Sequence, residues 1–76
     1  MNKPVRFDRH ARRRMKWRKI LEEEVLAVVN NPDNTESSMK GRINLYKKIE
    51  SKYLKVTCKE FPDELLIISV VDKGGD

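Results

Sequence analysis

The stretch RINLYKKIESKYLKVTCKEFPDELLIISVV, residues 42–71, decides the fold. Its first two segments alternate apolar and polar residues, a period of two that predicts half-buried strands. Residues 65–71 are apolar at nearly every position, which predicts a central strand covered on both faces. The turns at 50–52 and 62–64 are short, so we expect the three strands to form sequential antiparallel hairpins. The apolar positions of the two alternating segments are Ile43, Leu45, Ile49, Leu54, Val56 and Cys58.

The residues upstream begin with a helical period. Asp8 can cap a helix by accepting hydrogen bonds from backbone N–H groups two or three residues on. The helix is then expected from about Arg9 to Arg18. Phe7, Ala11 and Met15 are spaced by four residues, so they share one face that is expected to point to the core.

A second helix is expected from about Leu21 to Asn30. Leu21, Val25, Val28 and Val29 follow the spacing of a buried stripe. Three glutamates in the first turn match the helix dipole. Pro32 then ends the helix, because proline cannot continue it.

The remaining segments complete the predicted fold. A weak strand is expected at 35–39 with a turn at 40–41, and 74–76 is expected to be a loose tail. The sequence therefore predicts an α+β protein, with two N-terminal helices packed on one face of a three- to four-stranded antiparallel sheet. All 76 residues belong to one domain, with a core at about 7–73.

Composition limits the class of protein. Hydrophobic residues make up 38% of the chain and charged residues another 38%, which is too apolar for a disordered chain and too charged for a membrane protein. No segment approaches the roughly 20 apolar residues of a spanning helix, and we recognise no signal peptide. A single histidine and a single cysteine predict neither a disulfide nor a zinc site. We expect a cytoplasmic protein that uses no metal and no cofactor.

Charge is distributed unevenly along the chain. The formal net charge is +5, yet residues 1–19 carry nine lysines and arginines against one aspartate. Residues 20–36 carry five acids and no base. Such asymmetry favours a polyanionic partner on one face, most simply RNA or DNA.

The only histidine lies inside the basic segment and is a candidate catalytic group. Metal-independent RNA cleavage needs a base for the ribose 2′-OH, positive donors for the phosphate and an acid for the leaving oxygen. His10 is the natural acid or base, because histidine titrates near neutrality. Arg14 and Arg18 lie one and two turns further along the helix, where they could grip phosphate. His10, Arg14 and Arg18 are therefore the candidate catalytic residues, and Lys59 and Lys73 are further candidates for a proton donor.

Five other residues are candidates for nucleic-acid binding. Arg13 and Trp17 lie beside the row of His10, and the Trp17 ring could stack on a base. Arg42, Tyr46 and Lys48 share one face of a predicted strand and could complete the site from the sheet. Each has a structural alternative: a solvated arginine, a core tryptophan or an ordinary strand residue.

The run FDRHARRRMKWRKI, residues 7–20, carries a resemblance. With the later segments NNPD, YLKVT and LLIISVV, it resembles small bacterial and archaeal domains of unknown function that begin with a helix of the type H-A-x-x-R-M-x-x-R-x-I. These domains look allied to the RelE/ParE superfamily of toxin–antitoxin systems, and the resemblance covers about residues 7–73. The group often has serine where Leu21 stands here, as the cap of the second helix.

The resemblance implies two helices on a small antiparallel sheet. It also implies a metal-independent endoribonuclease acting on messenger RNA, often on the ribosome, although ParE-like relatives act on DNA gyrase. Three hypotheses stay open: a RelE-like toxin, a non-catalytic nucleic-acid- or ribosome-binding domain, and a module that docks an acidic antitoxin-like protein. None of the three involves a membrane, and the oligomeric state stays open.

Overall fold

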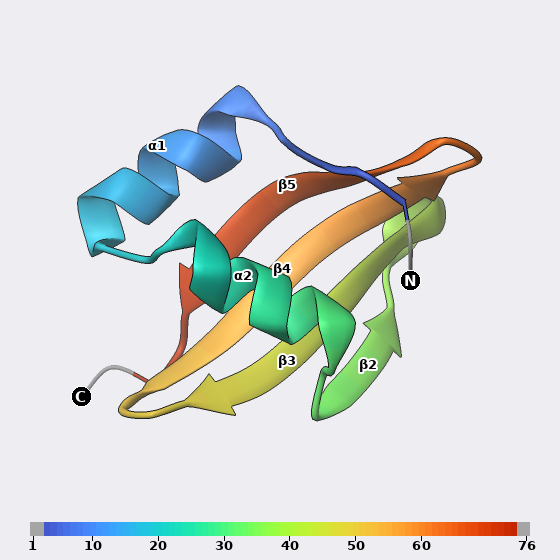
Figure 1. Cartoon of the computed structure of the whole chain (residues 1–76). Coiled ribbons are helices and arrows are strands. Elements are labelled where there is room, and N and C mark those ends of the chain that lie inside the picture. Colours follow the sequence, from blue (N-terminus) through green and yellow to red (C-terminus); the bar gives the residue numbers. More distant parts are fainter. Residues whose placement is uncertain (1–2, 75–76) are drawn as a thin grey trace.

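The computed structural model describes residues 3–74 and has two layers. Two helices lie on one face of a five-stranded sheet, as Figure 1 shows, so the predicted α+β class and the helix-on-sheet arrangement are confirmed. Residues 75 and 76 of the predicted tail lie outside the described residues. In chain order the elements are β1 (Val5–Phe7), α1 (Arg9–Arg18), α2 (Glu22–Asn30), β2 (Asn34–Ser37), the 3₁₀ turn η1 (Met39–Gly41), β3 (Arg42–Ile49), β4 (Lys52–Phe61) and β5 (Glu64–Asp72).

The sheet has the strand order β1-β5-β4-β3-β2. The pairs β2–β3, β3–β4 and β4–β5 are antiparallel, as the sequence predicts. β1 corrects the prediction of three or four antiparallel strands, because it pairs in parallel with β5. Three residues are too short to show a period, and their partner strand is far away in the chain: the Leu65 N–H donates to the Pro4 carbonyl at 2.9 Å.

α1 has the predicted bounds, and its two ends are closed as expected for a helix of this sequence. One carboxylate oxygen of Asp8 accepts the His10 N–H at 3.1 Å. At the other end Lys19 takes a left-handed conformation with φ 59°, and the Ile20 N–H donates to the Met15 carbonyl at 2.8 Å. This closure satisfies carbonyl groups that the helix leaves free at its end.

The turn after α1 decides which residues of the junction are buried. Ile20 enters the core with 4% of its surface exposed, whereas Leu21 is 58% exposed. The prediction that Leu21 belongs to the buried stripe of the second helix is therefore wrong, while Val25, Val28 and Val29 are buried as predicted. α2 begins at Glu22, one residue later than expected.

The core lies between the helices and one face of the sheet. β5 is covered on this face only, which corrects the prediction of cover on both faces: Leu65, Ile67 and Val70 are buried and the residues between them are half-buried. We call the other side of the sheet the open face. On β2, β3 and β4, alternation and register place on it Asn34, Glu36, Arg42, Asn44, Tyr46, Lys48, Tyr53, Lys55, Thr57 and Lys59.

Candidate nucleic-acid interface

α1 presents one apolar side to β5 and one basic side to solvent. Ala11 and Met15 are buried, and this fixes the rotation of the helix about its axis. With about 100° between successive residues, the side turned away from the sheet carries cations around one aromatic ring. Its residues are Arg9, Arg13, Lys16 and Trp17, flanked by His10 and Arg14, and all six are exposed.

Most cations of residues 9–19 have no ion-pair partner among residues 3–74. The exception is Arg12, whose Nη1 lies 2.7 Å from a carboxylate oxygen of Glu22 and whose guanidinium carbon lies 5.0 Å from the centre of the Phe7 ring. The other ion pairs of the described chain do not involve α1. Six cations therefore have no ion pair within the part of the chain that the structure describes: Arg9, Arg13, Arg14, Lys16, Arg18 and Lys19. We call these six residues, with Trp17, the basic surface.

A shallow, open hollow lies on the basic surface. It is lined by Arg13, Arg14, Lys16 and Trp17. Trp17 is 77% exposed, and the guanidinium carbon of Arg18 lies 5.6 Å from the centre of its ring. The structural alternative, a tryptophan in the core, does not apply in this conformation.

The candidate catalytic histidine stands at the first turn of α1. His10 is exposed, and its backbone N–H is used by Asp8 in the cap. Within the described residues its imidazole forms no hydrogen bond and no ion pair. Arg14 and Arg18 follow it along one flank of the helix, so the structure keeps the three predicted residues in one row.

The structure does not bring the sheet candidates to this row. Arg42, Tyr46 and Lys48 alternate with the core residue Leu45 and therefore lie on the open face. α1 lies on the opposite face of the sheet, as Figure 1 shows. Lys59 lies on the open face too. The described residues therefore do not bring the helix row and the sheet candidates together in one site.

The open face carries a polar cluster that the sequence pattern does not predict. The Tyr46 hydroxyl donates to Glu36 Oε1 at 2.9 Å, and the Asn44 amide donates to the same oxygen at 3.4 Å. Thr57 Oγ1 donates to Asn44 Oδ1 at 2.8 Å. The Tyr46 ring also stacks on Tyr53 with centroids 5.9 Å apart.

Electrostatics in this cluster favour an ionised carboxylate. The hydrogen bonds from Tyr46 and Asn44 hold the pKa of Glu36 below its usual value, with a further lowering from the charges of Lys55 and Lys73. The same bond raises the pKa of the Tyr46 hydroxyl. The only sequence signal for Glu36 was its place in the weak predicted strand, because the pairing of β2 with β3 decides what it meets.

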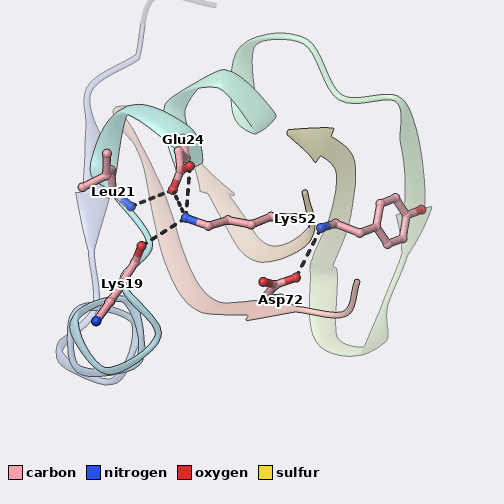
Figure 2. Close-up of polar contacts among 6 residues, drawn as sticks. Lys19, Leu21, Glu24, Lys52 and Asp72 are labelled. Carbon is pink, nitrogen blue, oxygen red and sulfur yellow. Dashed lines mark hydrogen bonds and ion pairs between the residues drawn. The ribbon is translucent and has the colours of Figure 1, made fainter. Parts of the chain in front are cut away.

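A second polar cluster fixes the junction of α1 and α2 to the sheet, as Figure 2 shows. Lys52 Nζ lies 2.9 and 3.1 Å from the two carboxylate oxygens of Glu24 and donates to the Lys19 carbonyl at 3.1 Å. The Leu21 N–H donates to Glu24 Oε1 at 2.9 Å. Leucine has no acceptor to return this bond, so only half of a capping box forms.

The pKa of Glu24 results from opposing effects. Burial raises it, but the hydrogen bonds from Leu21 and Lys52 outweigh burial and leave the pKa below its usual value. This carboxylate is therefore charged at neutral pH and ties the end of the basic surface to β4. It supports the site and does not form part of it.

Other candidate chemistry is limited in the described chain. Cys58 is buried as predicted, and burial raises the pKa of its thiol to about 11. Between residues 3 and 74 no group of three histidine, cysteine or acidic side chains is placed to hold a metal ion. None of the helices described has the length and apolar character needed to cross a membrane.

Fold and surface together define a small two-layer α+β protein with an exposed basic helix. The family described as Domain of unknown function (DUF4258) matches residues 7–72. The chain belongs to this family. Comparison of the chain with curated proteins and with solved structures found no match.

Proposed function

We propose that this protein binds RNA through the basic surface of α1. The observation that carries the proposal is the set of cations around the exposed ring of Trp17 that have no ion-pair partner among the described residues. Cations that are already paired inside a protein add little to the affinity for an external polyanion. Unpaired cations add more, because they exchange their counterions for phosphates. The arginine forks also match phosphate geometry.

The distribution of acids supports the same surface. Two of the three glutamates in the first turn of α2 are used at the junction: Glu22 pairs with Arg12 and Glu24 with Lys52. They therefore leave the outward side of α1 strongly positive. A field of one sign on one side of a small protein steers a polyanion to that side.

Binding of a labelled RNA, measured by anisotropy over a series of salt concentrations, tests this proposal. Arg13→Ala and Arg14→Ala should each weaken binding and lower the slope of log K against log salt by about one. Arg12→Ala is the matched control, because it removes the same charge from the same helix at a position already paired with Glu22. Equal losses in all three variants would show that only net charge matters.

Absence of salt-dependent RNA binding would refute the proposal. In that case, retention of an acidic protein from a nuclease-treated lysate would assign the basic surface to a protein partner of the antitoxin type. Since both partners are anionic, the nuclease treatment is what separates them.

A second candidate is metal-independent RNA cleavage, which the open-face cluster favours. In such a reaction a base takes the proton of the 2′-OH, the freed oxygen attacks phosphorus, and the bond to the 5′-oxygen breaks as an acid protonates it. The products are a 2′,3′-cyclic phosphate and a 5′-hydroxyl. Glu36 offers a carboxylate held by Tyr46, with Lys55 and Lys73 as charges for the phosphate. His10 with Arg14 and Arg18 offers the alternative centre.

Cleavage in EDTA, with and without ribosomes, tests the second candidate and locates its centre. If the open face is the centre, Glu36→Gln abolishes cleavage and His10→Ala leaves it intact; if the helix row is the centre, the reverse holds. RNA binding should survive both substitutions. A wild-type protein that binds RNA but cuts none in either setting would exclude the toxin-like activity.

A further inference from the structure

The exposed tryptophan of α1 has a consequence for the kind of RNA that binds. Trp17 follows the core residue Met15 by two positions, so its ring is turned about 200° away from the core side of the helix. Its 77% exposure agrees with this geometry. Most of the ring is therefore open to solvent, and the side chains that line the hollow with it are the cations Arg13, Arg14 and Lys16.

A ring held in this way has a π-face free among positive charges. The guanidinium of Arg18 lies over the ring at 5.6 Å from its centre, a cation–π contact that favours a defined ring position. Phosphate groups beside Arg13 and Lys16 would place a neighbouring base at the ring. The hollow therefore combines the two features of single-strand sites, backbone cations and a stacking aromatic.

We infer that the basic surface selects single-stranded over double-stranded RNA, with one unpaired base stacked on Trp17. The bases of a duplex are stacked on one another inside the helix, so their faces are not available to a side chain. A duplex therefore offers the surface only phosphates and 2′-hydroxyls, and the ring gains nothing from it. An unpaired strand offers both phosphates and base faces. This inference rests on the proposed function.

The test compares an oligouridine with an RNA duplex of the same length at one salt concentration. Trp17 is the only tryptophan, so its fluorescence reports stacking directly. We expect the oligouridine to quench it and the duplex to leave it nearly unchanged. Anisotropy of labelled RNA measures affinity independently, also in variants that lack tryptophan.

The key variant is Trp17→Leu, with Trp17→Phe as its matched control. Stacking of one base on an aromatic ring corresponds to about fivefold or more in affinity, so Trp17→Leu should weaken oligouridine binding by at least that factor. Its duplex binding and its salt slope should not change. Trp17→Phe keeps a ring and should restore most of the loss. Because Trp17 is outside the core, both variants should fold, and circular dichroism checks this.

Two results overturn the inference, and they are distinguishable. If Trp17→Leu weakens both RNAs equally or neither, the surface binds RNA without base stacking, and only the inference fails. If the wild-type protein binds neither RNA, the proposed function fails with it.

Discussion

Replacing Lys52 by methionine should destabilise the fold by releasing the junction of α1 and α2. Methionine keeps most of the apolar length of the side chain and removes the ammonium group with its three hydrogen bonds, two to Glu24 and one to the Lys19 carbonyl. Glu24 then keeps only the bond from the Leu21 N–H. The change tests whether this cluster holds the helices on the sheet.

The size of the loss follows from burial. Removing one partner of a fully buried ion pair costs about 3–5 kcal/mol, and a hydrogen bond to a charged group contributes about 1.5–3 kcal/mol. The side chains of Lys52 and Glu24 are 26% and 16% exposed, so water replaces part of what is lost. We expect a decrease of about 2 kcal/mol in the free energy of unfolding. For a domain of this size that is a fall of about 8–16 °C in Tm.

The assay is urea denaturation of both proteins over a range of pH. The folded-state pKa of Glu24 lies below its usual value of 4.5, so its contribution is present above the unfolded pKa and is lost as pH falls through the folded pKa. The difference between wild type and Lys52→Met should be full at neutral pH and shrink in acid below about pH 4.5.

Two further variants test whether the loss of stability comes from the contact between Lys52 and Glu24. Lys48→Met removes an exposed lysine of the same hairpin and should change stability by less than about 0.5 kcal/mol. Glu24→Gln combined with Lys52→Met should cost less than the sum of the two single changes, because they share one interaction. If Lys52→Met is no worse than Lys48→Met, or if its effect does not depend on pH, the cluster does not stabilise the junction.

Three other predictions concern single side chains. Leu21→Ser should stabilise the protein by about 0.5–1 kcal/mol in urea denaturation, because serine can cap α2 and complete the box with Glu24, while the exposed leucine loses little packing; destabilisation would show that Leu21 packs in solution. The Cys58 thiol should react slowly with a thiol reagent at about pH 8 in the native protein and fast in denaturant; fast native reaction would contradict its burial. Tyr46→Phe should raise the pKa of Glu36 in a carboxyl NMR titration, because the main hydrogen bond that lowers this pKa is lost. An unchanged pKa would show that the bond is not formed in solution.

Local patterns were sufficient for most elements of the fold. α1 has the bounds predicted from Asp8 and the spacing of Ala11 and Met15, and the turn at Lys40 and Gly41 is present. These features depend on caps, positive φ angles and periods, which act between residues close in the chain. The spacing pattern did not predict the exposure of Leu21, because the left-handed conformation of Lys19 changes the direction of the chain between the two helices.

Long-range contacts could not be predicted from local sequence patterns, for a different reason. β1 forms only because its backbone pairs in parallel with the edge of β5. A segment of three residues carries no sequence pattern that indicates a partner so far along the chain. The same holds for Glu36, which meets Tyr46 and Asn44 only through the register of β2 with β3. A pairing of this kind is selected by the whole sheet, not by the residues that take part in it.

The sequence by itself determined that this protein is a small α+β domain with a basic first helix, since periodicity and charge are properties of neighbouring residues. Only the tertiary structure decided which candidates share a site. Because Ala11 and Met15 are buried, Trp17 and the cations beside it face solvent. Strand alternation places Arg42, Tyr46 and Lys48 on the open face, on the other side of the sheet. The sheet therefore separates the basic surface from the polar cluster of the open face, because a side chain can reach only one face of the sheet.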